Sequence, residues 1–141
     1  MENTMDQFDV VVIGGGPGGY VAAIRAAQLG MKAAVIEAGA LGGVCLNVGC
    51  IPSKALLDSS EHYHNAHERF KTHGIEVSGL KINWAQMVQR KNGVVLENNK
   101  GVEFLMKKNK IDVHTGYGRI TDKNTVTVTA DGGKTVTLKT K

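Results

Sequence analysis

Two cysteines five residues apart are the side chains of this sequence best suited to redox or metal chemistry. Cys45 and Cys50 leave three interpretations open: half of a zinc site, two inert buried thiols, or a disulfide that opens and closes during catalysis. Zinc has numerical support, because His62 and His67 follow at a spacing close to that of a zinc finger. The position of the cysteines directly behind a β-α-β pattern argues against such a self-contained module.

The redox interpretation makes a demand on the backbone. In an ideal helix the Cα atoms of residues five apart lie about 8.7 Å from each other, beyond the ~7 Å that a disulfide can bridge. A disulfide therefore requires irregular backbone, which Asn47 and Gly49 can supply. Cys50 also precedes a predicted helix, whose partial positive charge favours a thiolate, and Lys54 can add charge on the same side. An accessible, strained disulfide in a cytosolic protein is more often catalytic than structural.

A glycine-rich turn precedes the cysteines and is suited to binding phosphate. Gly14, Gly16 and Gly19 stand at G-x-G-x-x-G spacing between a predicted strand and a predicted helix. The pattern assigns the tight turn to Gly14, close approach to a pyrophosphate to Gly16, and close packing of helix on strand to Gly19. Glu37 follows at the distance expected of a carboxylate that accepts from an unphosphorylated ribose. The pattern does not distinguish NAD from FAD, and a merely structural turn is the alternative.

The elements that must position these residues begin with β-α-β. Residues 8–13 are nearly all β-branched or aromatic, which predicts a strand buried on both faces of a parallel sheet. A helix is predicted from about Tyr20 to a closing Gly30, and a second strand over 33–36, with Glu37 at its carboxyl end. The fold class is therefore α/β, with a Rossmann-like β-α-β unit and a parallel sheet.

The later part of the chain predicts two long helices, a third strand and a hairpin. One helix is expected over about 52–70, and Asn83 should cap a second over 84–107. Glycines could kink that second helix, whose expected apolar face includes Trp84, Met87, Val88, Val95, Leu105 and Met106. Residues 111–114 are a candidate third parallel strand. The alternating segments 125–129 and 135–139 predict a C-terminal antiparallel β-hairpin or meander.

Composition excludes several classes of protein. With 42% hydrophobic and 21% charged residues the chain is typical of a globular protein, and no apolar run could cross a membrane. The N-terminus carries the acidic Glu2, Asp6 and Asp9 and no arginine before Arg25, which fits no targeting signal, so the expectation is a cytoplasmic protein. The net charge of +4 is spread out, and its small lysine cluster lacks aromatic neighbours, so no nucleic-acid partner is expected.

The residues quoted above carry a family resemblance. Segment 42–57, together with residues 11–19 and Glu37, resembles the flavin disulfide oxidoreductases, flavoproteins with a redox-active disulfide center. Branches that reduce glutathione or mercuric ion share the C-x4-C pattern. The run CLNVGCIPSKALL, with the His- and Tyr-rich segment after it, favours the branch that oxidises dihydrolipoamide. Val44 departs from the pattern, because the family usually has threonine there, and a hydroxyl contact to the cofactor is lost.

The resemblance implies a role for each matching residue. Cys45 would exchange with dihydrolipoamide, and Cys50 would stack on the flavin and pass it the electrons. Lys54 would lie beside the reactive edge of the flavin ring. The cofactor-binding residues that the resemblance implies are Gly14, Gly16, Pro17, Gly19, Glu37, Gly43, Lys54 and Gly118. No metal is implied.

The resemblance also implies more chain than is present. We expect residues 1–141 to be the N-terminal part of an FAD-binding domain, incomplete, with the NAD-binding and dimerisation domains absent. FAD is the expected cofactor and NAD⁺ the acceptor in a homodimeric parent enzyme. Its partner would be dihydrolipoamide on the acyltransferase lipoyl domain of a 2-oxo acid dehydrogenase complex. The isolated chain should bind FAD weakly and not turn over. The alternatives are a glutathione- or mercuric-reductase type, or a dinucleotide-binding module without redox activity.

Overall fold

Strand β3 (Ala33–Glu37) is the centre of the structure, a computed structural model that describes residues 7–141. It pairs in parallel with β2 (Val10–Ile13) on one side and β4 (Asp112–Thr115) on the other. Because side chains alternate along a strand, Ala33 and Val35 face one layer and Ala34 and Ile36 the opposite one. All four are almost completely buried, so β3 is covered on both faces.

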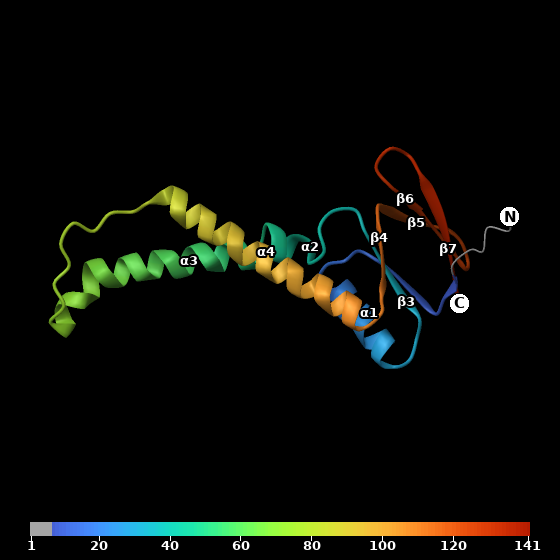
Figure 1. Cartoon of the computed structure of the whole chain (residues 1–141), viewed down its shortest axis with the longest axis horizontal. Helices are drawn as coiled ribbons and strands as arrows, with labels where there is room; N and C mark the ends of the chain where they lie inside the picture. The colour runs from blue at the N-terminus through green and yellow to red at the C-terminus, as the bar shows by residue number, and fades with distance from the viewer. Residues whose placement is uncertain (1–6) are drawn as a thin grey trace.

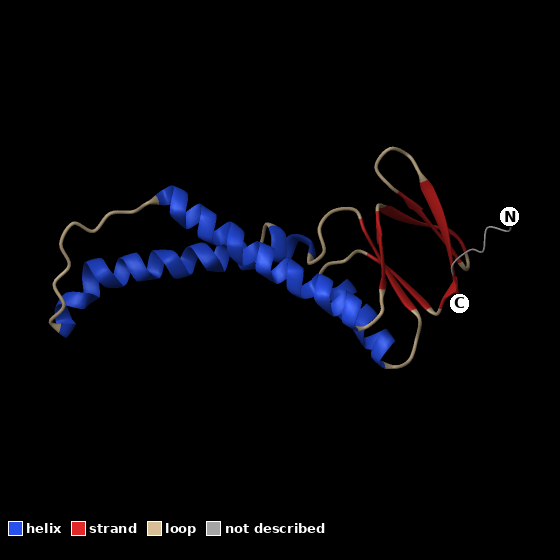
Figure 2. Ribbon diagram, in the orientation of Figure 1, coloured by secondary structure: helices blue, strands red, loops and turns tan. Residues whose placement is uncertain are grey.

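Helices cover the first face of this parallel sheet. α1 (Pro17–Gln28) presents Ala23 and Ala26, and α4 (Trp84–Lys108) presents Met106, to Ala33 and Val35. The small alanine side chains let α1 lie close to the strands. Figure 2 shows these helices on one side and all strands on the other. The predicted β-α-β unit is therefore confirmed, although α1 begins three residues earlier than expected.

A second, mixed sheet covers the opposite face. Its strands run in the order β1 (Gln7–Phe8), β7 (Thr135–Thr140), β6 (Thr125–Thr129), β5 (Tyr117–Asp122). β5, β6 and β7 pair antiparallel, which confirms the predicted hairpin and extends it to a meander. Phe8, Val126, Val128 and Leu138 pack from this sheet against Ala34 and Ile36.

The prediction of one continuous strand over 8–13 is wrong. The chain changes sheet at Asp9, because β1 pairs with β7 while β2 pairs with β3. The Asp9 carboxylate accepts from the Lys32 amide at 2.8 Å, and this contact fixes the crossing point. Within the described residues β2 is an edge strand, and 46% of Ile13 is exposed, so burial on both faces holds for β3 but not for β2.

The segment between β3 and β4 forms a helical arm that projects from the layered body (Figure 1). It contains α2 (Gly43–Asn47), α3 (Cys50–His64), a π-helix (Asn65–Arg69), a 3₁₀-helix (Phe70–His73) and α4. The predicted helix over 52–70 thus begins two residues earlier and changes type at Asn65. Arg90 of α4 donates to the Ala55 carbonyl oxygen at 2.8 Å and to Asp58 at 2.6 Å, and so ties the two long helices together.

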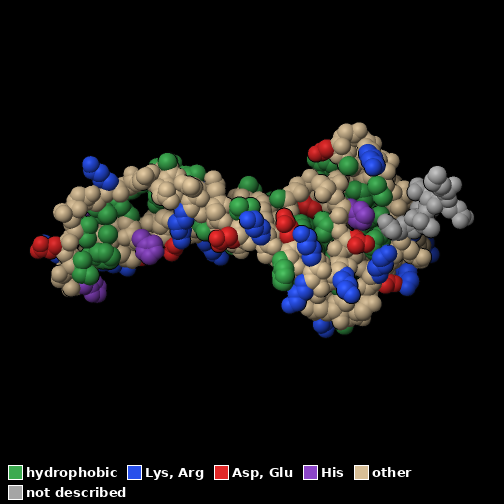
Figure 3. Space-filling model, viewed as in Figure 1, with side chains coloured by type: hydrophobic (Ala, Val, Ile, Leu, Met, Phe, Trp, Pro, Cys, Tyr) green, Lys and Arg blue, Asp and Glu red, His purple; other side chains and the backbone are tan. Residues whose placement is uncertain are grey.

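The predicted cap of α4 is confirmed, because Asn83 accepts from the Gln86 amide at 3.1 Å. The helix differs from its prediction in two ways, the first being that it continues without a break through Gly93 and Gly101. Its buried residues are Val102 and Met106, whereas Trp84, expected on the apolar face, is 63% exposed. Figure 3 shows hydrophobic side chains open to view along the arm.

The sequence predicts that no apolar segment crosses a membrane and that the protein is cytoplasmic. None of the helices in residues 7–141 combines the length and the apolar character needed to cross a bilayer. Glu2 and Asp6, two of the acidic residues on which the cytoplasmic prediction depends, lie outside the described residues.

Candidate functional site

The glycine-rich turn joins β2 to α1 and leaves no room for a side chain at Gly19. Gly14 has φ +102°, and its amide donates to the Ile36 carbonyl oxygen at 2.7 Å. A Cβ on Gly19 would lie 1.8 Å from the Gly14 carbonyl oxygen and 3.3 Å from a Val12 methyl group. Glycine at position 19 therefore lets the first turn of the helix rest directly on the strand, which is the geometry that the spacing predicts.

The start of α1 forms a cradle of free backbone amides. Gly16 is the N-cap without a side-chain hydrogen bond, and Pro17 occupies the first helical position. The amides of Gly18 and Gly19 have no acceptor one turn earlier and carry the positive end of the helix dipole. Gly43 approaches from the next segment, where an added Cβ would lie 2.8 Å from the Gly16 Cα. Two glycine turns thus meet at one end of the parallel sheet, an arrangement that fits a diphosphate.

Glu37 ends β3 beside this cradle. Its Oε2 atom accepts from the Gly15 amide at 2.7 Å, and its Oε1 atom accepts from the Gly39 amide at 2.8 Å. Both carboxylate oxygens are therefore oriented by backbone at the point where a ribose is expected.

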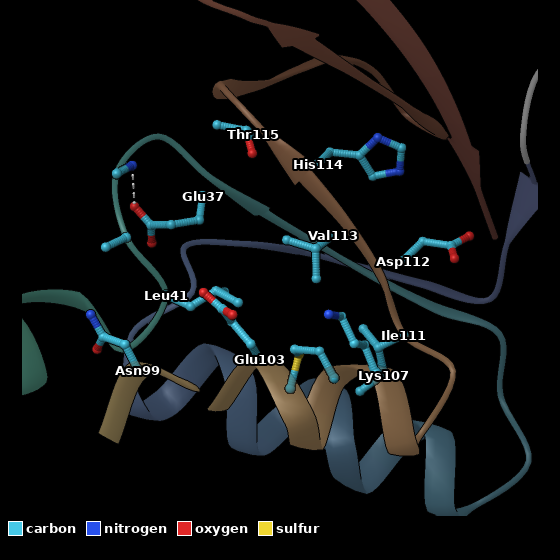
Figure 4. A pocket seen from close by; sticks show the side chains of 13 residues that line it. Glu37, Leu41, Asn99, Glu103, Lys107, Ile111, Asp112, Val113, His114 and Thr115 are labelled. Carbon is cyan, nitrogen blue, oxygen red and sulfur yellow. Dashed lines mark hydrogen bonds between the residues drawn. The ribbon is translucent and has the colours of Figure 1, made fainter. Parts of the chain in front are cut away.

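A cavity of about 700 Å³ begins at Glu37, at the carboxyl end of β3, and extends along the whole of β4 from Thr115 to Asp112. Figure 4 shows Glu103 and Lys107 reaching toward it from α4, opposite Val113 of β4. Open parallel sheets bind ligands at this edge. The cavity therefore has the position expected for the adenosine part of a dinucleotide.

The packing of β5 against the parallel sheet explains why position 118 is glycine. It lies in β5, paired with Val128 of β6. A Cβ there would lie 3.1 Å from the Ile36 side chain and 3.2 Å from that of Ile13. Glycine thus lets β5 lie close to the parallel sheet, and its predicted contact with adenine stays a prediction.

The two cysteines lie in separate helices. Cys45 belongs to α2 and is half-buried, whereas Cys50 is the first residue of α3 and is exposed; both are free thiols. Gly49 lies between them, and an added Cβ would lie 2.9 Å from the Val44 carbonyl oxygen and 3.3 Å from the Cys45 Cα. The start of α3 therefore folds onto α2 only because position 49 is glycine. The break that a disulfide requires is present, and the disulfide itself stays a prediction.

The two thiols are close enough to change each other's chemistry. Hydrogen bonding with the Cys50 side chain is the main cause that raises the pKa of the Cys45 thiol above its ordinary value, and burial adds to the effect. The Cys50 backbone amide and the Lys54 charge act on that pKa in the opposite direction and are weaker. Lys54 thus has the influence expected of its charge, but on Cys45, and the thiol form of Cys45 is favoured near neutral pH.

A second cavity, of about 740 Å³, opens beside Cys45. Cys45 is one of its lining residues and Cys50 is not. The other lining residues come from α1, the α2–α3 region and α4 and are mostly apolar: Pro17, Tyr20, Leu46, Ile51, Glu97, Asn98, Gly101, Val102, Phe104 and Leu105. We call this cavity the Cys45 groove. Sequence reasoning missed it, because its two walls are some fifty residues apart in the chain.

Two asparagines hold the cysteine segment in place. The Asn47 side-chain amide donates to the carbonyl oxygens of Gly43 at 2.8 Å and Leu41 at 3.2 Å. Its Oδ1 atom accepts from Asn99 of α4 at 2.7 Å. The sequence assigned Asn47 an irregular backbone only and gave no signal for Asn99.

The described residues contain no set of side chains that could act as the ligands of a zinc site. Nowhere in residues 7–141 do three side chains of the His, Cys, Asp and Glu types come together as metal ligands. His62 and His67 instead make local contacts within the arm, with Asp58 and Glu68 respectively.

Comparison with known proteins gives one family and several close relatives. The family model for pyridine nucleotide-disulphide oxidoreductases matches residues 8–141. Dihydrolipoyl dehydrogenase 1, mitochondrial, from Arabidopsis thaliana is 55% identical over 133 residues, covering 93% of this chain and 26% of that protein. Leghemoglobin reductase from Vigna unguiculata is 56% identical, covering 93% and 25%. Dihydrolipoyl dehydrogenase from Bacillus subtilis is 59% identical, covering 81% and 24%. The chain spans about a quarter of the length of these curated relatives.

Proposed function

The chain belongs to the pyridine nucleotide-disulphide oxidoreductase family, and on that premise we propose that it carries the dithiol half-site of a dihydrolipoyl dehydrogenase. In this proposal Cys45 and Cys50 alternate between a disulfide and two thiols. Dihydrolipoamide gives up two hydrogens to the disulfide, which opens to two thiols, while the substrate closes to lipoamide. The whole-protein reaction, with NAD⁺ as acceptor, is part of the same proposal.

One observation carries the division of labour between the cysteines: Cys45 lines the groove and Cys50 does not. A substrate dithiol bound in the groove would meet Cys45, so we assign Cys45 as the exchanging thiol and Cys50 as the thiol that passes electrons to the flavin, although Cys50 is the more exposed of the two. Thiol–disulfide exchange starts with attack of a thiolate on one sulfur, and access decides which sulfur is attacked. The mostly apolar lining suits the hydrocarbon chain of a lipoyl group better than the charged glutathione peptide.

Membership of the family implies FAD and NAD(H) as cofactors, and the residues present fit the dinucleotide part of FAD. The amides of Gly18 and Gly19, in a turn that only glycine can make, would hold the diphosphate. Glu37 would accept from the adenosine ribose. Gly16, Pro17 and Gly43 would shape the cradle, with Lys54 and Gly118 as further contacts. When bound, FAD supplies a two-electron acceptor for the dithiol.

The experiment that tests this function compares reductants. The chain is first oxidised to the Cys45–Cys50 disulfide and then treated with dihydrolipoamide, dithiothreitol or reduced glutathione at equal thiol concentration; samples are quenched with acid over time, and the protein thiols are counted by alkylation and mass spectrometry after the reductant is removed. Each dithiol that is oxidised should release two protein thiols. We expect dihydrolipoamide to react faster than dithiothreitol, because only its apolar chain can use the Cys45 groove.

Controls separate the alternatives. A chain of glutathione-reductase type would react fastest with glutathione, and a dinucleotide-binding module without redox activity would form no intramolecular disulfide. Phe104→Ser, which removes an aromatic side chain from the Cys45 groove, should reduce the advantage of dihydrolipoamide over dithiothreitol. Equal rates for the two dithiols in the unsubstituted chain would contradict the proposed substrate.

Partners and compartment complete the proposal. We propose that the dihydrolipoamide is carried on the acyltransferase lipoyl domain of a 2-oxo acid dehydrogenase complex, and that the whole protein is a homodimer. The cytoplasm is the proposed compartment, although the Arabidopsis relative is named as mitochondrial. Cell fractionation with an antibody against the chain tests that location.

A further inference from the structure

Helix α2, which carries Cys45, is too short to hold its own position. It has five residues, of which only Leu46 is buried. Isolated helices shorter than about 12–15 residues are marginal in water, so the place of α2 depends on contacts to the rest of the chain. The orientation of the Cys45 thiol depends on the same contacts.

Asn47 supplies the polar part of those contacts. Its Nδ2 group faces the carbonyl oxygens of Gly43, Leu41 and, at 3.4 Å, Ala40. Three carbonyl acceptors around this atom identify it as the amide nitrogen and the other end of the Asn47 side chain as the oxygen. The Oδ1 atom is therefore left for a donor from outside the segment.

Asn99 of α4 is that donor. Its Nδ2 atom lies 2.7 Å from Asn47 Oδ1 across 52 positions of sequence. Its own Oδ1 is buried and finds no partner among the described atoms. The hydrogen bond to Asn47 is therefore the polar contact that stabilises the position of the Asn99 side chain.

We propose that Asn99 is a positioning residue for Cys45, acting through Asn47; this rests on the proposed function of the cysteine pair. Residues two apart on a helix point about 200° apart around its axis, given about 100° per residue. The Asn99–Asn47 bridge therefore holds α2 at a position different from that of Cys45, while Asn98 and Val102 of the same helix α4 line the groove beside Cys45. It fixes the rotation of α2, and with it the approach of the two sulfur atoms, without touching either.

The test measures how readily the pair closes. The full chain is equilibrated with reduced glutathione and glutathione disulfide, so that two protein thiols and one glutathione disulfide give the protein disulfide and two reduced glutathiones. Samples are quenched with acid, alkylated and weighed by mass spectrometry. Asn99→Asp keeps the shape of the side chain but removes the donor. It should lower the effective concentration of the cysteine pair at least about fivefold, the net worth of one hydrogen bond, because the new carboxylate oxygen also faces the Asn47 oxygen.

Matched variants exclude a general effect on stability. Asn92→Asp makes the same change at an exposed position two turns earlier on α4 and should leave the equilibrium unchanged. Asn99→Ala should reproduce the shift without adding charge, and it serves if Asn99→Asp does not fold. All samples are kept below their unfolding transitions, checked by circular dichroism, so a residue with a merely structural role would lower Tm and leave the redox equilibrium alone.

The outcomes are distinct. A redox equilibrium that is the same in Asn99→Asp, Asn99→Ala and the unsubstituted chain overturns this inference and leaves the proposed function standing. An unsubstituted chain that forms only mixed disulfides with glutathione overturns the proposed function, and this inference with it.

Discussion

Adjacent glycines at the start of α1 allow a sharp test of the cradle, because the structure gives them opposite surroundings. A Cβ on Gly19 would lie 1.8 Å from the Gly14 carbonyl oxygen, a backbone atom that cannot rotate away. A Cβ on Gly18, the neighbouring helical residue, would meet nothing within 4 Å. Gly19→Ala and Gly18→Ala therefore add the same atoms to the same turn, and only the first creates a collision.

The magnitudes follow from these distances. Inserting a methyl group into a packed site costs about 1–3 kcal/mol and sometimes more, and a backbone overlap of this depth belongs at the upper end. Alanine in place of glycine inside a helix contributes about 0.5–1 kcal/mol of stability. Because both variants gain this helix contribution, it cancels between them, and we expect their free energies of unfolding to differ by about 3 kcal/mol, which for a chain of this size is a Tm difference of roughly 8–12 °C.

Urea unfolding followed by circular dichroism measures the free energy of unfolding of each variant. Calorimetric titration with ADP measures binding to the cradle. Gly18→Ala should unfold at higher urea and still bind ADP, whereas Gly19→Ala should unfold at lower urea and lose binding. If Gly19→Ala proved as stable as Gly18→Ala and bound ADP equally well, the assignment of the turn would be refuted.

Further predictions concern single side chains. Gly49→Ala should lower the effective concentration of the cysteine pair about tenfold in glutathione buffers, since relieving an overlap worth ~1–3 kcal/mol moves α3 away from Cys45. Cys50→Ala removes the main cause that raises the pKa of Cys45, so the pH profile of Cys45 alkylation should move to lower pH. Glu37→Gln places an amide donor against a backbone amide and should cost about 1–3 kcal/mol in urea unfolding and weaken ADP binding. Asn83→Ala removes the cap of α4 and should cost about 1 kcal/mol in the same unfolding assay.

The sequence predicted those elements whose local pattern agrees with their final surroundings. Residues 33–36 form an unbroken apolar run and lie in β3, so this run was sufficient to predict a strand. The turn at Gly14–Gly19 was predictable because two of its glycines have local reasons: Gly14 has φ +102°, and a Cβ on Gly19 would collide with the Gly14 carbonyl oxygen five residues earlier. The start of α4 was predictable from Asn83, because this residue caps the helix by accepting a hydrogen bond from Gln86, only three positions later.

The remainder depends on contacts between distant segments. The pairing of β1 with β7 joins the two ends of the described chain, and nothing local to Phe8 indicates that the strand divides at Asp9. The apolar face of α4 was misjudged because Trp84 lies out on the arm, away from the sheet, while Met106 lies over it. The partner of Asn47 lies on another helix, which no spacing rule connects to the cysteine segment.

The most direct test of the whole account is the covalent state of its two sulfur atoms after mild oxidation. We predict that the monomeric chain loses two hydrogen atoms in mass, that peptide mapping links Cys45 to Cys50, and that dihydrolipoamide restores both thiols. A product that joins two chains, carries sulfenic acid on one cysteine, or resists dihydrolipoamide would contradict the claim that this chain holds a redox-active dithiol.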